Sequence, residues 1–146
     1  MDKIIDFKTA QYAKQKGFDE LCFHYYDEYG KLQKPFFPND CHSDYQISLT
    51  NLSENYNTKY SYVFSAPTQS SLQKWLREKH KILVEVVYDV TAKQFNFTIC
   101  YMEQFNFTIC YMDGRRFEYN GSTDFEAALE TGLVETLMYC IKSVVN

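Results

Sequence analysis

The chain has 146 residues, 45% of them hydrophobic and 23% charged, which is the composition of a globular protein large enough for one domain with one core. Its formal net charge of −4 argues against a protein that coats nucleic acid, because such proteins meet phosphate groups with an excess of Lys and Arg. Every apolar run falls short of the roughly 20 residues that a membrane-spanning helix needs, which argues against a helical membrane protein.

Residues 7–16 predict the first helix. Asp6 can cap its start, alanines favour its interior, and Gly17 stands where a left-handed residue ends many helices. Phe18 should then fold back towards Ala13, the usual apolar companion of such an ending. The chain is therefore expected to start with a short helix that has local signals at both ends.

The following residues predict a hairpin and then a long loop. Strand-forming residues fill 21–26, a turn signal occupies 27–30, and residues 31–37 return as a second strand. Residues 38–60 are dominated by Asn, Ser, Asp and Thr. We expect them to form a surface loop around one short strand near residues 45–49.

A second helix is predicted to open at residues 65–68, with Pro67 near its first turn. The side chains spaced to share one face of this helix are Leu72, Trp75, Leu76 and Lys79. Trp75 is therefore expected to anchor the core rather than a ligand. Cations end the helix at residues 79–81, where the negative end of the helix dipole favours them.

Residues 94–112 contain one nine-residue word twice. QFNFTICYM fills residues 94–102 and again 104–112, with Glu103 alone between the copies. Phe, Phe, Ile and Tyr alternate with other residues in each copy, so each copy predicts a strand with one apolar face. The copies are offset by an even number of residues, so equivalent apolar residues fall at the same alternating positions in both strands. The chain thus contains a tandem duplicated strand.

Pairing parity predicts how these strands connect. Residues 82–90 alternate as a preceding strand, and a loop at 91–94 opposes Val90 to Phe95, Tyr88 to Phe97 and Val86 to Ile99. A hairpin loop at 102–104 opposes Tyr101 to Phe105, Ile99 to Phe107 and Phe97 to Ile109. Residues 115–119 then pair with the second copy across a loop at 112–114, opposing Ile109 to Phe117 and Phe107 to Tyr119. The result is an antiparallel meander of about four strands.

The duplication leaves one alternative open. Because identical segments compete for one place in a sheet, one copy could bulge out or swap with a partner chain. Strand pairing or swapping of this kind would make the protein a homodimer. Deleting residues 94–103 should leave the fold intact if the duplication is passive.

The last helix is predicted from the capping sequence at residues 123–126. Its buried stripe should consist of Phe125, Ala128, Leu129, Leu133, Leu137, Cys140 and Ile141. Asp124, Glu126 and Glu130 should point outward near the positive end of the helix dipole. Together the elements predict a single α+β domain over residues 1–146, in which an N-terminal helix and hairpin precede a meander packed by a preceding and a following helix.

Cysteine and histidine offer weak candidate sites. The five cysteines include no CxxC pair, and their odd number favours free thiols in a reducing cytoplasm. Cys41 and His42 place a thiol beside a base, although sequence neighbours rarely reach the geometry of an activated nucleophile. Cys22 and His24 could join them as metal ligands, but the spacing is poor. A half-buried strand and an ordinary loop explain these residues better, so we expect no metal, cofactor or catalytic site.

Cations gather at the end of the second predicted helix: Lys74, Arg77, Lys79, His80 and Lys81. They offer contacts for phosphates, and Tyr25, Tyr26 and Tyr29 offer faces on which bases stack. A solvated helix end that complements the dipole is the simpler explanation. The helix–meander–helix order is like that of a double-stranded RNA-binding module, but the acidic start of the last helix has the wrong charge for phosphates.

Three stretches of the chain stand out as motifs: AQYAKQKGFD at residues 10–19, APTQSSLQKWLREKH at 66–80 and FEAALETGLVETL at 125–137. Together they resemble a family of small proteins encoded in bacteriophage and prophage genomes of gut Bacteroidetes. The middle stretch is the most specific of the three. The resemblance implies no activity and no functional residues. The second copy of the repeat departs from it, since one strand is expected there.

The sequence lacks a Gly-rich phosphate loop, an HExxH motif and a GxSxG motif, which are common catalytic signatures. We therefore expect a non-enzymatic, phage-like accessory protein that acts by contact with an unknown protein partner. The alternative is a weak nucleic-acid-binding protein that uses the basic end of the second helix. A salt-dependent shift with DNA or RNA would separate the two hypotheses.

Overall fold

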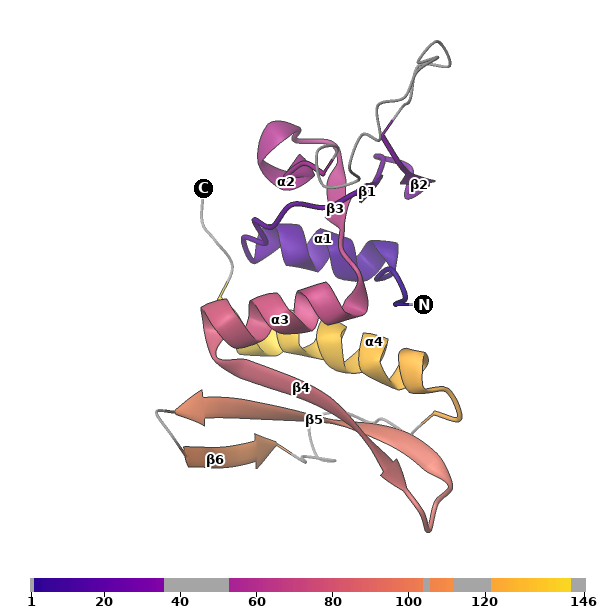
Figure 1. Ribbon diagram of the computed structural model, residues 1–146, viewed down its shortest axis with the longest axis vertical. Helices are drawn as coiled ribbons and strands as arrows, with labels where there is room; N and C mark the ends of the chain where they lie inside the picture. Colours follow the sequence, from indigo (N-terminus) through magenta and orange to yellow (C-terminus); the bar gives the residue numbers. More distant parts are fainter. Residues whose placement is uncertain (1, 36–52, 104–105, 112–121, 143–146) are drawn as a thin grey trace, which may run out of the picture.

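The computed structural model describes the chain at residues 2–35, 53–103, 106–111 and 122–142. Its helices and antiparallel sheets confirm the predicted α+β class. The smaller sheet has the strand order β2 (Leu32–Gln33), β1 (His24–Tyr26), β3 (Phe64–Ala66). The larger sheet has the order β4 (Ile82–Asp89), β5 (Gln94–Glu103), β6 (Asn106–Tyr111). Figure 1 shows the two sheets towards opposite ends of the molecule, with the longer helices between them.

The first helix, α1 (Phe7–Gln15), forms for the local reasons that the sequence predicts. It follows Asp6 as N-cap, and Gly17 adopts the left-handed conformation with φ of 83°. The Phe18 N–H donates to the Ala13 carbonyl at 2.9 Å, which is the long bond of a Schellman motif. Phe18 is consequently turned into the core, where it is almost fully buried.

The smaller sheet contains one strand that the sequence analysis missed. β1 and β2 form the predicted hairpin around the turn at residues 27–30. On the other side of β1 lies β3, with Tyr25 opposite Ser65. The prediction assigned residues 65–68 to the start of a helix, which is wrong for Ser65 and Ala66. A three-residue strand is too short to show alternation, and Pro67 gave the stronger, helical signal.

A second short element falls in the stretch predicted as a loop. The one-turn helix α2 (Tyr56–Lys59) lies against β3, and its N-cap Asn55 accepts the Thr58 N–H at 3.3 Å. The short strand expected near residues 45–49 lies outside the described residues. The loop prediction rested on polar composition alone, which does not distinguish a loop from a capped helical turn.

Helix α3 (Gln69–His80) begins two residues after Pro67, with Thr68 as N-cap. Leu72, Trp75 and Leu76 form the buried face as predicted, with Gln69 as a fourth buried member. Lys79 is wrongly placed on this face by the prediction, since its side chain is 53% exposed. Its ammonium keeps its hydration at the helix end instead of entering the core.

The strands of the larger sheet pair antiparallel, β4 with β5 and β5 with β6, in a register that differs from the predicted one. Between β4 and β5 the structure opposes Tyr88 to Phe95, Val86 to Phe97 and Val84 to Ile99, a shift of two residues. A shift of two preserves parity, so the apolar faces still match. The shift arises at the turn, where the Asp89 carboxylate accepts the N–H groups of Thr91 and Ala92 at 2.8 and 3.0 Å.

The two copies of the repeat lie side by side in β5 and β6. The predicted loop at 102–104 is wrong, because Glu103 still pairs with Asn106. The register shifts at a bulge between Tyr101 and Met102, and Tyr101 lies opposite Ile109. The strand predicted at residues 115–119 lies outside the described residues. The chain returns to the first copy at Ser122, whose N–H donates to the Phe95 carbonyl at 2.9 Å.

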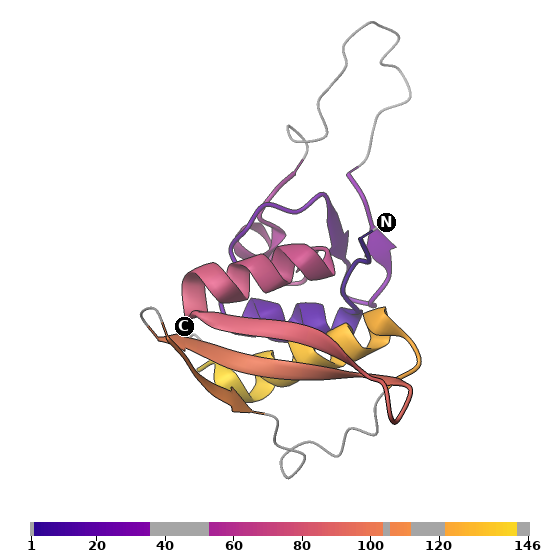
Figure 2. The same cartoon turned by 60° about the horizontal axis from the view of Figure 1, so that its bottom comes forward.

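Helix α4 (Phe125–Glu135) and the π-helical η2 (Thr136–Cys140) close the fold. Figure 2 shows α4 along the same face of the larger sheet that α3 covers. The predicted stripe is buried at Ala128, Leu129, Leu133, Leu137 and Ile141, and Cys140 is half-buried. Two predictions here are wrong: Phe125 is 45% exposed, and Glu130, expected to point outward, is 8% exposed. Glu130 is buried because α1 and α3 supply donors for its carboxylate.

One hydrophobic cluster joins the two ends of the molecule. It includes Val63 beside the smaller sheet, Trp75 of α3, Ile99 of the larger sheet and Leu133 of α4. Ile5, ahead of α1, is fully buried in the same cluster. The helical layer thus serves as common support for both sheets, and it fixes the surface of the smaller sheet against a rigid base.

Candidate functional site

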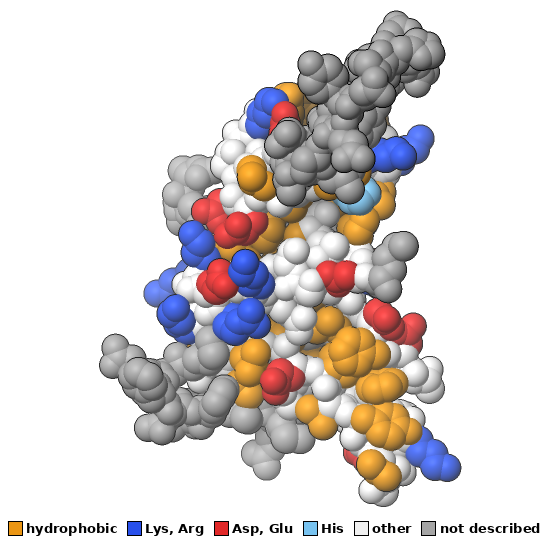
Figure 3. Space-filling model, in the orientation of Figure 1, with side chains coloured by type: hydrophobic (Ala, Val, Ile, Leu, Met, Phe, Trp, Pro, Cys, Tyr) orange, Lys and Arg blue, Asp and Glu red, His pale blue; other side chains and the backbone are white. Residues whose placement is uncertain are grey.

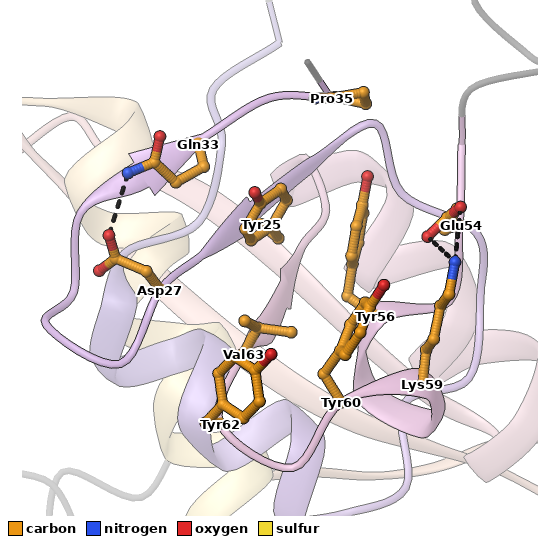
Figure 4. Close-up of a pocket in the computed structure, with 10 residues that line it drawn as sticks. All are labelled: Tyr25, Asp27, Gln33, Pro35, Glu54, Tyr56, Lys59, Tyr60, Tyr62 and Val63. Atoms are coloured by element: carbon orange, nitrogen blue, oxygen red, sulfur yellow. Dashed lines mark hydrogen bonds and ion pairs between the residues drawn. The ribbon is translucent and has the colours of Figure 1, made fainter.

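An open cleft lies where β1 and the residues around α2 meet at the surface (Figure 4). Its volume of about 670 Å³ is typical of sites that hold a small ligand. Four tyrosines line it: Tyr25, Tyr56, Tyr60 and Tyr62. We call this site the tyrosine cleft.

Local structure explains why these rings meet. Tyr25 comes from β1, whereas Tyr56 begins α2 and Tyr60 follows it four residues later, on the same side of the helical turn. The turn is held in place by Asn57, whose side-chain oxygen accepts the Ser65 N–H at 2.9 Å. The strand β3 therefore fixes α2, and α2 positions its tyrosines against β1.

The four rings give the cleft a floor and a rim. Tyr25 and Tyr56 lie with ring centroids 4.5 Å apart and planes tilted by 31°, and Tyr56 is only 5% exposed. Tyr60 and Tyr62 lie 5.9 Å apart and are 37% and 58% exposed. The first pair is a packed aromatic floor, and the second presents aromatic faces to solvent.

A negative charge stands at one end of the tyrosine cleft. The Asp27 carboxylate accepts the Gln33 side-chain N–H at 3.0 Å and the backbone N–H groups of Tyr29 and Lys31 at 3.0 and 2.9 Å. These bonds, the one from Gln33 first, lower the pKa of Asp27 from its ordinary value, so the carboxylate is ionised at neutral pH. Its main structural task is to fix the turn between β1 and β2.

The opposite end of the cleft carries a neutralised pair. Both carboxylate oxygens of Glu54 lie 2.9 Å from the Lys59 ammonium, which stands 5.4 Å from the centroid of the Tyr60 ring. The bond to Glu54 raises the pKa of Lys59. The Lys59 ammonium neutralises the Glu54 carboxylate, so the described lining keeps one net negative charge, which lies at Asp27.

The phenol of Tyr56 is not poised for proton transfer. Burial, with the charge of Glu54 nearby, raises the pKa of Tyr56 to about 12, far from the neutral value at which a general acid or base works best. None of the described lining residues is a Cys, His or Ser that would act as a nucleophile or base. The cleft offers flat aromatic faces and phenolic hydroxyls instead.

The predicted phosphate contacts run from Lys74 in the middle of α3 to Lys81 after its last residue, and Figure 3 shows Lys and Arg side chains gathered with acidic ones among them. Lys74, Arg77, Lys79 and Lys81 are exposed. The Lys79 ammonium lies 3.8 Å from the Asp19 carboxylate. Glu20 and Glu78 line a small hollow together with Lys74. Acidic side chains therefore reduce the positive field at this helix end.

The fifth predicted contact, His80, is half-buried with its ring 4.5 Å from that of Trp75. Burial lowers the pKa of His80, so its imidazole is neutral at neutral pH and adds no charge to the cluster. Trp75 itself is 3% exposed and donates from Nε1 to the Asp19 carboxylate at 3.1 Å. Its predicted role as a core anchor is confirmed.

The three tyrosines expected to stack bases separate in the structure. Tyr25 lines the tyrosine cleft, whereas the Tyr26 hydroxyl donates to the Ile5 carbonyl at 2.8 Å and thus holds the N-terminal segment. Tyr29 is 86% exposed in the turn after β1. Only Tyr25 therefore belongs to the site that the structure builds.

The weak thiol and metal candidates gain no support from the described residues. Cys41 and His42 lie outside them. Cys22 is buried, its backbone pairs with that of Glu54, and burial raises the pKa of its thiol to about 12. His24 pairs within β1. Across the described ranges no group of three or more His, Cys, Asp or Glu side chains is placed to hold a metal ion.

Sequence reasoning missed the tyrosine cleft. Tyr56 and Tyr60 fall in the stretch predicted as a loop, and Tyr62 follows it directly. The available signal was Asn55 as a capping residue with two tyrosines spaced i,i+4 after its cap position. The contribution of Tyr25 depends on strand pairing between distant segments, which no local pattern reveals.

Comparisons with known proteins leave this site as the main guide to function. The chain matches no protein-family model, no curated protein and no solved structure. In the described part of the chain, no helix has the length and apolar character needed to cross a membrane.

Proposed function

We propose that the protein is a non-enzymatic, phage-like accessory protein that binds another polypeptide in the tyrosine cleft. The observation that carries the proposal is the cleft itself, in which four tyrosines meet on a fixed support, with no Cys, His or Ser among the described lining residues. A reducing cytoplasm is the compartment that suits it, because the cysteines in the described residues, Cys22, Cys100 and Cys140, are free thiols.

The chemistry of tyrosine supports a protein partner. Tyrosine is enriched at protein interfaces because its ring covers a large apolar area, its hydroxyl makes hydrogen bonds, and few torsions are frozen on binding. The rim residues Tyr60 and Tyr62 expose such rings, and the buried Tyr56 beneath them keeps the surface from collapsing. A site of this kind gains affinity from a few aromatic contacts rather than from a large area.

Selection from a random-peptide library on the immobilised protein tests the proposal. Enriched peptides should bind the wild-type protein and lose about tenfold or more in affinity on Tyr62→Ser, since aromatic contacts at the centre of an interface dominate binding. Tyr29→Ser is the matched control, because Tyr29 is more exposed and lines no part of the cleft. Peptides that bind both variants equally, or no enrichment at all, would contradict the proposal.

A second candidate function rests on the exposed cations Lys74, Arg77, Lys79 and Lys81 at the end of α3. We propose weak nucleic-acid binding there as the alternative. A gel-shift titration with DNA and RNA at low salt should then show a complex that dissociates when salt is added. Arg77→Glu should weaken this complex. No complex at low salt would remove this candidate.

A further inference from the structure

We infer that the tyrosine cleft receives a proline-rich segment in the polyproline II conformation, with a cationic residue of that segment at Asp27. The inference rests on the proposed function and adds the chemistry of the partner. Figure 4 shows the arrangement that supports it: the tyrosines stand between the Asp27–Gln33 pair at one end and the Glu54–Lys59 pair at the other.

The hydrogen-bonding groups of the cleft favour a ligand that accepts rather than donates. The Asp27 carboxylate already receives three N–H groups, and both oxygens of Glu54 are engaged by Lys59. Within the described residues, the hydroxyls of Tyr25 and Tyr62 donate to no partner. A chain of carbonyl oxygens without N–H groups fits the open phenolic donors.

Polyproline II meets this requirement and also matches the aromatic surface. Proline has no N–H, and the helix leaves every carbonyl free because it makes no internal hydrogen bonds. Its rings are flat and apolar, so they pack on tyrosine faces such as those of Tyr60 and Tyr62. The segment is already extended before binding, which keeps the entropy cost low.

The charge distribution sets the direction and excludes anionic ligands. Asp27 holds the only uncompensated charge among the described lining residues, since Glu54 neutralises Lys59. A phosphate in the cleft would face this carboxylate and find no free cation. An arginine or lysine at the corresponding end of the peptide gains attraction to Asp27, although an exposed pair of this kind contributes little to affinity. The aromatic contacts therefore provide most of the affinity, and Asp27 provides the orientation.

The test uses fluorescence anisotropy with the full chain and three labelled peptides of about nine residues, roughly 28 Å long in polyproline II. The first is proline-rich with one terminal arginine, the second replaces the arginine by glutamate, and the third keeps the arginine but replaces proline by alanine. The first should bind best. Glutamate should weaken binding about threefold to fivefold at low salt, and alanine by tenfold or more.

Asp27→Asn is the variant that isolates the charge. Asparagine keeps the oxygen that accepts the N–H groups of Tyr29 and Lys31, so the turn should remain folded, which circular dichroism will show. The variant should bind the arginine and glutamate peptides alike while still preferring proline over alanine. Tyr62→Ser should weaken all three peptides, and Tyr29→Ser none.

The outcomes separate this inference from the function on which it rests. If library-selected peptides bind at the cleft but lack proline, or the alanine peptide binds as well as the proline peptide, the partner chemistry is wrong and the proposed function stands. If no peptide binds and Tyr62→Ser changes nothing, both fail. A labelled oligonucleotide that binds in competition at the cleft would also overturn the inference.

Discussion

At the residue scale, the buried carboxylate of Glu130 joins three helices. Its Oε1 accepts the Asp6 N–H at 2.7 Å and the Thr9 hydroxyl at 2.5 Å, and its Oε2 accepts the Gln69 side-chain N–H at 2.8 Å. Asp6 is the N-cap of α1, but its own side chain makes no capping bond. Glu130 on α4 therefore supplies from another helix the acceptor that a capping box supplies locally, at the positive end of the α1 dipole.

We expect Glu130→Gln to lower the free energy of unfolding by about 1–3 kcal/mol, because the charge-assisted bonds to the donors of α1 and α3 are lost or weakened. Urea denaturation followed by circular dichroism measures this change. Glu78→Gln is the control, since Glu78 is an exposed carboxylate on α3 and its change should stay within about 0.5 kcal/mol. Equal effects of the two variants would contradict the role of Glu130.

The sequence predicted Glu130 wrongly for a physical reason. It follows Glu126 by four residues and so lies on the same side of α4, near the helix start, where acidic residues normally face solvent. Its burial depends on donors from residues about 60 and 120 positions away in the chain. Single-sequence patterns describe the helix that carries a residue, and they do not describe the helices that will surround it.

At the element scale, α4 packs tightly against the larger sheet at Gly132. A Cβ added there would lie 3.0 Å from the Phe97 Cβ and 3.0 Å from the Val84 Cγ1. Both contacts are to atoms held close to the backbone of central parts of β5 and β4, so neither can move easily. The absence of a side chain at this position therefore sets the distance between helix and sheet.

Gly132→Ala should consequently destabilise the fold by about 1–3 kcal/mol through overpacking, although alanine favours a helix by about 1 kcal/mol. Thermal and urea unfolding of the variant measure the net effect. Thr131→Ala, at the neighbouring half-buried position of α4, is the control and should change stability by less than about 1 kcal/mol. A Gly132→Ala protein that is more stable than wild type would show that the contact is loose.

The duplicated strands show what pairing parity can and cannot predict. Parity correctly matched the apolar faces of β4 and β5, because a face depends only on alternation. It missed the register on both sides of β5, because the turn at Asp89 and the bulge after Tyr101 add or remove residues without leaving a sequence signal. The same limit hid β3, whose three residues are defined by pairing with β1 alone.

Deleting residues 94–103 should leave a soluble, folded protein. The remaining copy then follows Lys93 directly and takes the place of β5 beside β4. In the shortened chain, the predicted pairing of the remaining copy with residues 115–119, continued along both strands, opposes Phe105 to Gly121. In the full-length protein the equivalent residue of the first copy, Phe95, bridges to Ser122, which is one residue further along the chain. The return of the chain to this edge of the sheet is therefore compatible with a single copy.

Circular dichroism and cooperative urea unfolding of the purified deletion variant check this expectation. The control deletes a stretch of equal length, residues 82–91, which removes β4 and its buried Ile82 and Val84 and should abolish the soluble fold. An insoluble protein from the 94–103 deletion would show that the second copy is a required part of the sheet.

At the scale of the whole molecule, the tyrosine cleft and the core are linked through buried ionisable groups. The backbone of Cys22 pairs with that of Glu54, which lines one end of the cleft, and Cys22 belongs to the same hydrophobic cluster as Tyr56 and Trp75. Burial raises the pKa of the Cys22 thiol from 9.0 to about 12 and that of the Tyr56 hydroxyl from 10.0 to about 12. The folded state therefore keeps both groups neutral, and their ionisation at high pH lowers the free energy of unfolding.

This linkage predicts a loss of stability in alkali. In the unfolded chain Cys22 ionises near pH 9, whereas in the fold it stays protonated until about pH 12. Between these values the folded state binds more protons, so the free energy of unfolding is fully present below pH 9 and falls as the pH rises towards 12. Cys22→Ala should therefore lose less stability than wild type over this interval, although it is weaker by about 1 kcal/mol at neutral pH from lost packing.

Urea denaturation of both proteins at a series of pH values measures the difference in slope. Cys140→Ala is the matched control, because Cys140 is only half-buried and contributes a cysteine of the same chemistry outside the cleft. The free energy of unfolding of this variant should fall with rising pH as that of the wild-type protein does. Parallel declines for all three proteins would mean that Cys22 reaches solvent in the folded state and that the core around it is open rather than packed.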